Sequence, residues 1–157
     1  KSAKYSVEAP LLIGAALAGA TPEQEQALSD FGLPVGVAFQ LRDDLLGVFG
    51  DAELTGKPSG DDLLEGKRTV LVTLARESLP ATQRLIFDEL LGDPTLDDEQ
   101  LGMLQLTIRS SDAVTKVEQM ISRNVHRAEA ALDFAPLDQG VRQQLIALAH
   151  RAAKRAA

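Results

Sequence analysis

The segment from Val37 to Phe49 constrains the fold more than any other part of the sequence. Placed on a helical wheel at about 100° per residue, its polar residues fall within roughly 100° of the circumference, and Phe, Leu and Val fill nearly all the rest. The polar stripe, which continues into the next turn, consists of Gln40, Asp43, Asp44, Gly47 and Asp51. A surface helix would show a broad polar face, so the pattern predicts a helix buried in a bundle, with its carboxylates facing an enclosed polar cavity.

The carboxylates of this stripe need positive charge nearby, because an unpaired buried charge is strongly destabilising. The Gly-rich stretch after the helix supplies Lys57 and Lys67. Hard oxygen ligands such as Asp43 and Asp44 suit Mg²⁺. Acids that hold Mg²⁺ and lysines that meet its anionic ligand together predict a phosphate or diphosphate site, and the simpler alternative is a solvated helix end.

Composition restricts both the fold class and the partners. With 157 residues, 45% hydrophobic content and only 4% aromatic residues, the chain fits one domain with an aliphatic core. Ala, Leu, Glu, Gln and Arg are abundant, so we expect an all-α fold. The net charge of -7 argues against general nucleic-acid binding. The sequence has no cysteine, which is compatible with a cytoplasmic protein, and its longest weakly apolar run, residues 9–20, is too short for a membrane span.

Helix start and stop signals divide the rest of the chain. We expect helical segments over 2–20 with a kink or interruption at Pro10, from Thr21 to Phe31, from a break or kink at Gly32, Pro34 and Gly36 to Gly50, and over 69–77, 81–91, 97–109, 112–135 and 137–157. Five small residues should let a neighbouring helix approach closely: Gly14, Ala15, Ala16, Ala18 and Gly19. The connection over 50–68 is long enough to expect a functional loop.

Two other loop motifs come close to matching this connection. A phosphate-binding P-loop fails, because five residues instead of four separate Gly50 from Gly56, and Pro58 follows Lys57. A calcium loop starting at Asp51 places Asp62 where a bidentate Glu is wanted, and is kept as a third alternative.

The remaining acidic and histidine residues have structural interpretations. Asp97, Asp98 and Glu99 open a helix, so capping and the helix dipole explain them. Asp61 and Asp62 either cap the short turn that follows or act in the surroundings of the site. His126 and His150 stand alone on predicted helices without a nucleophile nearby in sequence, so we expect structural or surface roles for them.

The residues around the stripe also carry a family resemblance. The run FQLRDDLLGVFGD followed by TGKPSGDDLLEGKRT closely resembles the second aspartate-rich region of the trans-isoprenyl diphosphate synthases, the polyprenyl synthetase family. KSAKY at the start is similar to that family's Lys-Thr/Ser segment one helix earlier. The resemblance extends more weakly over residues 1–157, which would be roughly the C-terminal half of one polyprenyl synthetase domain of the geranylgeranyl diphosphate synthase type.

This resemblance implies an all-α isoprenoid synthase bundle and a Mg²⁺-dependent prenyltransferase that joins isopentenyl diphosphate to an allylic diphosphate. It implies Mg²⁺ ligands at Asp43 and Asp44, and it makes Asp43, Asp44 and Lys57 the catalytic residues. The positions that match allylic diphosphate contacts are Lys1, Ser2, Gln40, Lys57 and Lys67. It further implies a cytoplasmic enzyme without a membrane span, which forms a homodimer when intact.

The sequence departs from the family pattern in two ways. The DDxxD motif ends on Gly47 instead of aspartate, and Asp51 on the same face is the candidate to assist through water. The family's first aspartate-rich motif and its isopentenyl diphosphate-binding basic residues have no counterpart in this chain, which opens on Lys1 without methionine. We therefore expect a fragment with little or no activity by itself. The alternative is a non-catalytic helical partner or regulatory subunit related to these enzymes.

Overall fold

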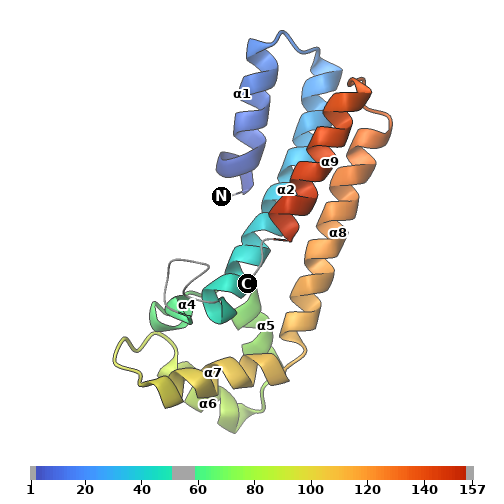
Figure 1. The fold of residues 1–157 in the computed structure, drawn as a ribbon. Helices are drawn as coiled ribbons and strands as arrows, with labels where there is room; N and C mark the ends of the chain where they lie inside the picture. The colour runs from blue at the N-terminus through green and yellow to red at the C-terminus, as the bar shows by residue number, and fades with distance from the viewer. Residues whose placement is uncertain (1–2, 51–58, 155–157) are drawn as a thin grey trace. The chain divides into compact units, whose positions relative to one another are not determined.

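The structure is a computed structural model that describes residues 3–50 and 59–154. Its helical segments are η1 (Lys4–Glu8, a π-helix), α1 (Ala9–Leu17), α2 (Pro22–Phe49), α4 (Asp61–Leu64), α5 (Val70–Ser78), α6 (Ala81–Leu90), α7 (Asp98–Ser110), α8 (Ala113–Asp133) and α9 (Gln139–Ala153) (Figure 1). The described residues contain no strand, so the all-α prediction is confirmed. The chain divides into two compact units, one built from residues 3–42 and 120–154 and the other from 43–50 and 59–119.

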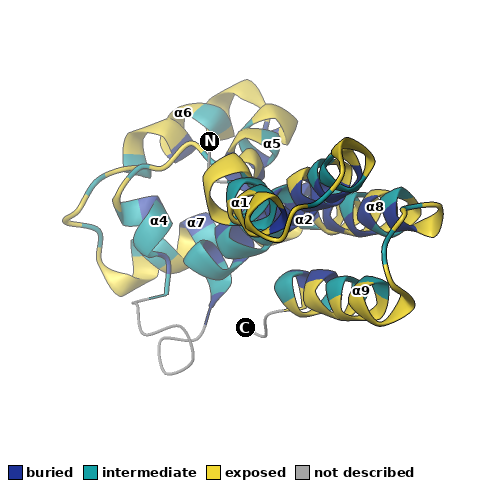
Figure 2. Cartoon of the chain, turned by 90° about the horizontal axis from the view of Figure 1, so that it is seen from above, coloured by how far each residue is buried: buried dark blue, intermediate teal, exposed yellow. Residues whose placement is uncertain are grey.

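The first unit is a bundle of α1, the first part of α2, the second part of α8, and α9. Its core joins Phe31 and Val35 of α2 to Leu132 of α8 and Ala149 of α9, with Leu11 of α1 packed against them. Figure 2 shows exposed residues on the outer side of α9 and buried residues on the side facing its neighbours. Phe31 is fully buried. Burial of an apolar side chain of this size stabilises the folded state by about 1.5–3 kcal/mol relative to leaving it exposed.

A break before the central helix, one of the two outcomes predicted at Gly32, Pro34 and Gly36, is wrong, and the other outcome, a kink, stays a prediction. Helix α2 runs without interruption from Pro22 to Phe49 with Pro34 inside it. A Cβ on Gly36 would lie 2.6 Å from the Cα atom of Ala3, and one on Gly32 would lie 2.9 Å from the Cδ1 atom of Leu11. These glycines therefore allow η1 and α1 to pack closely on α2. The close approach predicted at residues 14–19 is not seen at Gly14, around which a Cβ would meet open space.

Most predicted helix ends are confirmed by their hydrogen bonds. The side chain of Thr21 accepts a hydrogen bond from the Gln24 amide before α2, and Asp97 and Gln100 form a capping box before α7. The interruption near Pro10 coincides with the change from η1 to α1. Helix α9 starts two residues later than predicted, because the Asp138 side chain accepts from the Gly140 amide.

In the second unit, α7 braces the end of α2. Gln105 donates from Nε2 to the Val48 carbonyl at 2.7 Å and to the Ser59 hydroxyl at 3.1 Å. The Arg109 guanidinium lies 5.0 Å from the centre of the Phe49 ring. The final turn of an α-helix leaves its carbonyls without partners inside the helix, and Gln105 supplies a partner for one of them.

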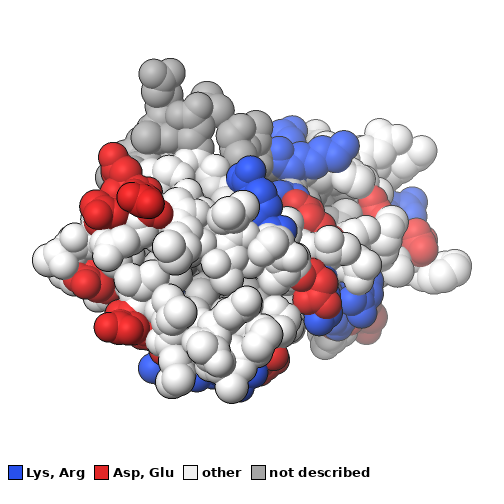
Figure 3. Space-filling view, turned by 90° about the horizontal axis from the view of Figure 1, so that it is seen from below, with Lys and Arg blue, Asp and Glu red and all other residues white. Residues whose placement is uncertain are grey.

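The core of this unit is aliphatic with one aromatic ring. Its buried side chains include Leu45, Val48, Leu63, Leu71, Val72, Phe87, Leu104 and Ile108. An apolar groove of about 310 Å³ lies along α6 and α7, where Ile86 and Met103 are each half exposed. In the space-filling view, residues other than Lys, Arg, Asp and Glu make up much of the surface nearest the viewer (Figure 3). None of the described helices has the length and hydropathy needed to span a membrane.

Candidate functional site

The predicted carboxylate stripe lies on a well-packed part of α2. Asp44 is only 6% exposed and is the charged residue that the described part of the chain buries, while Asp43 is partly buried. No described residue from Gln40 to Gly50 is classed as exposed. The expectation of a buried helix is therefore confirmed, whereas the enclosed polar cavity that its carboxylates were expected to face stays a prediction.

The turn after α4 brings a lysine and two more carboxylates together. The Lys67 ammonium donates to Asp62 Oδ1 at 2.6 Å and lies 2.8 Å from Glu65 Oε2. The hydrogen bond to Asp62, followed by the one to Glu65, raises the pKa of Lys67 well above its ordinary value. The Asp62 side chain is 14% exposed and that of Glu65 is 52% exposed, so Asp62 is the more enclosed partner.

Gly47, where the family motif would end in aspartate, touches this cluster. A Cβ atom built on Gly47 would collide with the carboxylate of Asp62. Gly47 lies one helical turn beyond Asp43, about 6 Å along the axis. The Asp62 carboxylate therefore occupies the space beside α2 that the side chain of the final motif residue would otherwise take.

The backbone of α4 is held in place by close contacts on both sides. Leu63 is fully buried, and its carbonyl accepts from the Gly92 amide at 2.9 Å. Gly66 and Gly92 both have positive φ, and a Cβ on Gly66 would lie 2.9 Å from the Gly92 Cα atom. At the other end, a Cβ on Gly60 would meet Leu101 Cδ1 at 2.8 Å. These contacts hold Asp62, which lies between Gly60 and Gly66, and Lys67, which follows Gly66 directly.

The other predicted site residues have different outcomes. Gln40 is partly buried and lies one turn before Asp43 and Asp44 on α2. Lys1, Ser2, Asp51 and Lys57 lie outside the described residues. The interpretation of Asp62 as a capping residue is wrong, because Gly60 occupies the N-cap of α4 and no side chain caps it. The contact of Asp62 with Lys67 agrees with the alternative, a role in the surroundings of the site.

Sequence reasoning missed the contact between Gly47 and Asp62, and it also missed the bracing of α2 by Gln105 and Arg109. Asp62 comes fifteen positions after Gly47, on a different helix, and no periodic pattern in the sequence links the two residues. The only signal available was negative, a glycine at a position where the motif has an acid.

Arg42, the charged residue on the apolar side of α2, has a structural partner. Its Nε donates to the carbonyl of Ala153, the last residue of α9, at 2.8 Å. A cation at a helix C-terminus is favourable because the helix dipole is negative there. Arg42 therefore belongs to the packing of the first unit.

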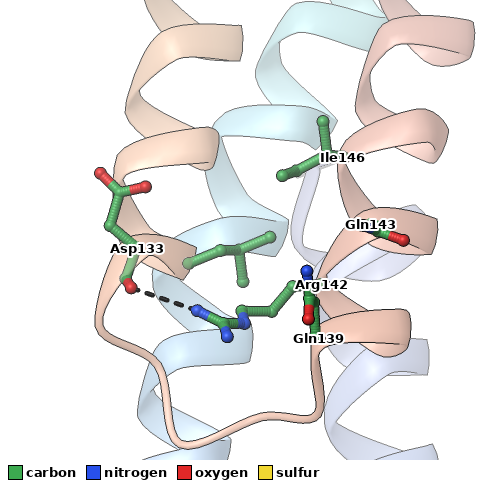
Figure 4. A pocket seen from close by; sticks show the side chains of 6 residues that line it. Asp133, Gln139, Arg142, Gln143 and Ile146 are labelled. Carbon is green, nitrogen blue, oxygen red and sulfur yellow. Dashed lines mark hydrogen bonds between the residues drawn. The ribbon is translucent and has the colours of Figure 1, made fainter.

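Other polar features of the first unit also have structural explanations. A pocket of about 240 Å³ opens at the turn between α8 and α9, where Arg142 Nη1 donates to the Asp133 carbonyl at 3.3 Å (Figure 4). His126 lies 3.2 Å from the Glu129 carboxylate within α8, and His150 of α9 contacts the same carboxylate at 2.8 Å and so links α9 to α8. This agrees with the structural roles expected for the histidines.

The donor set at Asp43 and Asp44 fits a divalent cation that is shared with a phosphate ligand. No three His, Cys, Asp or Glu side chains gather as a metal cage anywhere in residues 3–50 and 59–154. Mg²⁺ commonly binds to one or two carboxylates and completes its octahedron with water and substrate phosphates. Two neighbouring aspartates on a packed helix therefore suit Mg²⁺ in combination with an anionic ligand.

Comparison with known proteins agrees with this geometry. Residues 1–106 match the family described as polyprenyl synthetase. The chain is 38% identical over 142 residues to a geranylfarnesyl diphosphate synthase from Aeropyrum pernix, covering 90% of this chain and 43% of that protein.

Two solved structures extend the similarity to the fold. A geranylgeranyl pyrophosphate synthase from Corynebacterium glutamicum, complexed with isoprenyl diphosphate and magnesium, is 41% identical with a TM-score of 0.93, covering 98% of this chain and 44% of that one. A polyprenyl synthase from Caulobacter crescentus, complexed with calcium and isoprenyl diphosphate, is 31% identical with a TM-score of 0.82, covering 96% and 46%. The chain belongs to the polyprenyl synthetase family, and it spans less than half the length of each of these three proteins.

Proposed function

We propose that the chain is the C-terminal part of a single polyprenyl synthetase domain whose intact protein is a Mg²⁺-dependent trans-prenyltransferase. In the proposed reaction the allylic C–O bond breaks, diphosphate leaves, and the double bond of isopentenyl diphosphate forms the new C–C bond. Loss of one proton then gives the longer trans-isoprenyl diphosphate. The observation that carries the proposal is the packed Asp43–Asp44 pair on α2, with the Lys67 cluster one turn further on beside Gly47.

In this proposal Asp43 and Asp44 hold the metal, which supplies charge neutralisation that makes diphosphate a better leaving group. Lys67 donates to the diphosphate oxygens, since an ammonium group is a strong donor to phosphate. Gln40, Lys1, Ser2 and Lys57 are proposed as further diphosphate contacts, and Lys57 as a catalytic residue, on the basis of their motif positions alone.

Magnesium as the specific cation is also a proposal. The solved relatives named above were complexed with magnesium in one case and calcium in the other. Mg²⁺ is favoured here because a site with two carboxylates leaves most of the coordination to water and phosphate, as Mg²⁺ prefers. Ca²⁺ takes six to eight oxygen ligands and draws more of them from carboxylates and carbonyls of the protein.

Three further parts of the proposal come from the family resemblance. The chain alone is expected to be inactive, because the family's first aspartate-rich motif has no counterpart in it. The intact protein is proposed to form a homodimer and to act in the cytoplasm on isopentenyl and allylic diphosphates.

The experiment that tests the proposal is calorimetric titration of a non-hydrolysable allylic diphosphate analogue, with and without Mg²⁺. We expect binding by the wild type only when Mg²⁺ is present, and at least a tenfold loss of affinity in Asp43→Ala, equivalent to about 1.4 kcal/mol. Glu99→Ala is the matched control, because it removes an exposed carboxylate from α7. Equal binding by wild type and Asp43→Ala would refute the metal site.

The second candidate function is the non-catalytic helical partner, favoured by Gly47 in place of the last motif acid. It predicts tight association with a longer synthase and no Mg²⁺-dependent diphosphate binding. A calcium titration that produces no thermal shift would remove the calcium loop, the third alternative.

A further inference from the structure

We propose that Gly47 and Asp62 form an obligatory pair, in which the glycine leaves room for the Asp62 carboxylate and Asp62 is the positioning residue that holds Lys67 for the diphosphate. The role assigned to Lys67 rests on the proposed function. The coupling between Gly47, Asp62 and Lys67 rests on the structure of the second unit alone.

The first observation is steric. A Cβ atom on Gly47 would overlap both Oδ2 and Cγ of Asp62, and would lie 3.0 Å from Oδ1. All of these atoms belong to the end of one short side chain. A methyl group at position 47 can therefore be accommodated by rotation of Asp62, without movement of α2 or of the α4 backbone.

The second observation is that Asp62 and Lys67 are already joined. The ammonium–carboxylate distance is 2.6 Å, and the Lys67 amide donates to the Asp62 carbonyl at 2.9 Å, which closes the turn after α4. A rotation of Asp62 away from position 47 therefore changes the position of the Lys67 ammonium. Glu65 also contacts Lys67, but its side chain is more exposed and lies on the same turn.

The third observation is that Gly47 lies in the last turn of α2, two residues before Phe49, and still belongs to the helix. Glycine is less favourable than alanine at a helical position. A turn or a positive φ does not explain it, because Gly47 is not among the described residues with positive φ. The space taken by the Asp62 carboxylate does explain it, and Gly47 is then a positional requirement of this site and not a lost ligand.

The test uses the protein at its full natural length, with Gly47→Ala, Asp62→Ala and the double variant. The first measurement needs no ligand: the rate at which a lysine-acylating reagent modifies Lys67, followed by peptide mass spectrometry. We expect Lys67 to be modified about threefold faster or more in both single variants. This is the increase in the fraction of free amine that follows when the pKa falls by about half a unit. The double variant should react no faster than Asp62→Ala, since the methyl group then has no carboxylate to displace.

Lys116 is an internal standard in the same unit. It is paired with Asp112 at 2.7 Å, and its exposure is close to that of Lys67, 49% against 42%. Its rate should not change in any variant. Gly102→Ala is the matched control for the substitution itself, because Gly102 lies in α7 with open space around the position of a Cβ. An unchanged Lys67 rate in Gly47→Ala would overturn the proposal.

The second measurement is the affinity for the allylic diphosphate analogue with Mg²⁺, together with the thermal midpoint. Gly47→Ala should keep or raise the midpoint and still bind about tenfold more weakly, as expected for a lost charge-assisted contact. Adding Gly47→Ala to Asp62→Ala should not lower the affinity further. Asp62→Glu should bind more tightly than Asp62→Ala, because it restores a carboxylate near Lys67. Additive effects of the two substitutions on affinity would overturn the positioning role.

These measurements also separate the two proposals. If the wild type shows no binding that depends on Asp43, the proposed function fails, whereas the lysine modification rates still decide the Gly47–Asp62–Lys67 coupling. If the coupling is absent but binding depends on Asp43, only the present inference fails.

Discussion

At the scale of single residues, the described part of the site balances acidic groups against one lysine. Lys67 carries two carboxylate partners at hydrogen-bonding distance, and the acids Asp43 and Asp44 lie on the neighbouring stretch of α2. A diphosphate would therefore meet a lysine that is already charged and held in place. Preorganised donors of this kind lose little entropy when an anion binds.

The charge of Lys67 gives a prediction for the pH dependence of binding. Hydrogen bonds to Asp62 and Glu65 raise the pKa of Lys67 in the folded protein. The stabilisation linked to a raised pKa is complete below the unfolded value near 10.4 and is lost only as pH rises through the folded value. We therefore expect no loss of diphosphate affinity between pH 7 and about 10 that is due to Lys67.

Calorimetry across this range on wild type and Lys67→Arg checks the prediction, because arginine stays charged throughout. Parallel profiles are expected. A decline in the wild type that is missing in Lys67→Arg would show that Lys67 titrates in this range, and so that its partners do not hold it as the structure indicates.

At the scale of elements, the site depends on α4, which is too short to be stable alone. A four-residue helix does not overcome the free energy of helix nucleation. It is held instead by the buried Leu63 and by the close approach of the Gly66 and Gly92 backbones. Both glycines have positive φ, a conformation in which other residues are strained.

Replacement of Gly92 should therefore damage the site from a distance. Gly92→Ala introduces a Cβ 3.1 Å from the Gly66 Cα atom at a φ of 88°. We expect a loss of about 1–3 kcal/mol in the free energy of unfolding, together with weaker diphosphate binding, because Asp62 and Lys67 move with α4. Urea unfolding and calorimetry measure the two effects.

The control is Gly102→Ala on α7, which should gain up to about 1 kcal/mol from helix propensity and leave binding unchanged. If Gly92→Ala lowered stability but kept full affinity, the backbone contact with Gly66 would not be what positions the site.

The elements also show how far the sequence could be interpreted. Local signals predicted local structure well: the caps at Thr21 and Asp97 start α2 and α7, and the apolar pattern of α2 predicted its burial. The role of the glycines was missed, because Gly32 and Gly36 were assigned to a break or kink and their use as room for η1 and α1 was not predicted. The reason is physical, since a glycine in a helix is explained by the neighbouring element that it admits, and a single sequence does not reveal that neighbour.

The same limit applies to the candidate site. The acids of α2 could be predicted from their spacing along one helix, and Lys67 from its motif. The role of Asp62 could not, because its contacts with α2 depend on how α4 is anchored by Gly60, Gly66 and their neighbours. Contacts set by packing between elements are not encoded in a local pattern.

At the scale of the whole molecule, a net charge of -7 makes stability depend on how the carboxylates are partnered. Arg76 and Asp88 form a bidentate pair between α5 and α6, with both N–O distances 2.6 Å. The hydrogen bonds from Arg76 lower the pKa of Asp88, and hydrogen bonds from Thr95 lower the pKa of Asp93. Each lowered pKa favours the folded state while the carboxylate is ionised.

The chain should accordingly lose stability in acid. A lowered carboxyl pKa contributes stability that is present above the unfolded value near 3.9 and is lost as pH falls through the folded value. We expect a nearly constant urea midpoint from pH 7 to about 5 and a fall below about 4. Asp88→Asn should be less stable than wild type at pH 7 and should show a shallower fall, whereas Glu89→Gln, an exposed change at the next position of α6, should keep the wild-type slope. Identical slopes for wild type and Asp88→Asn would mean that the Arg76–Asp88 pair contributes nothing to folding. Because Arg76 and Asp88 both lie at the surface, high salt should screen their attraction and reduce the difference in stability between wild type and Asp88→Asn.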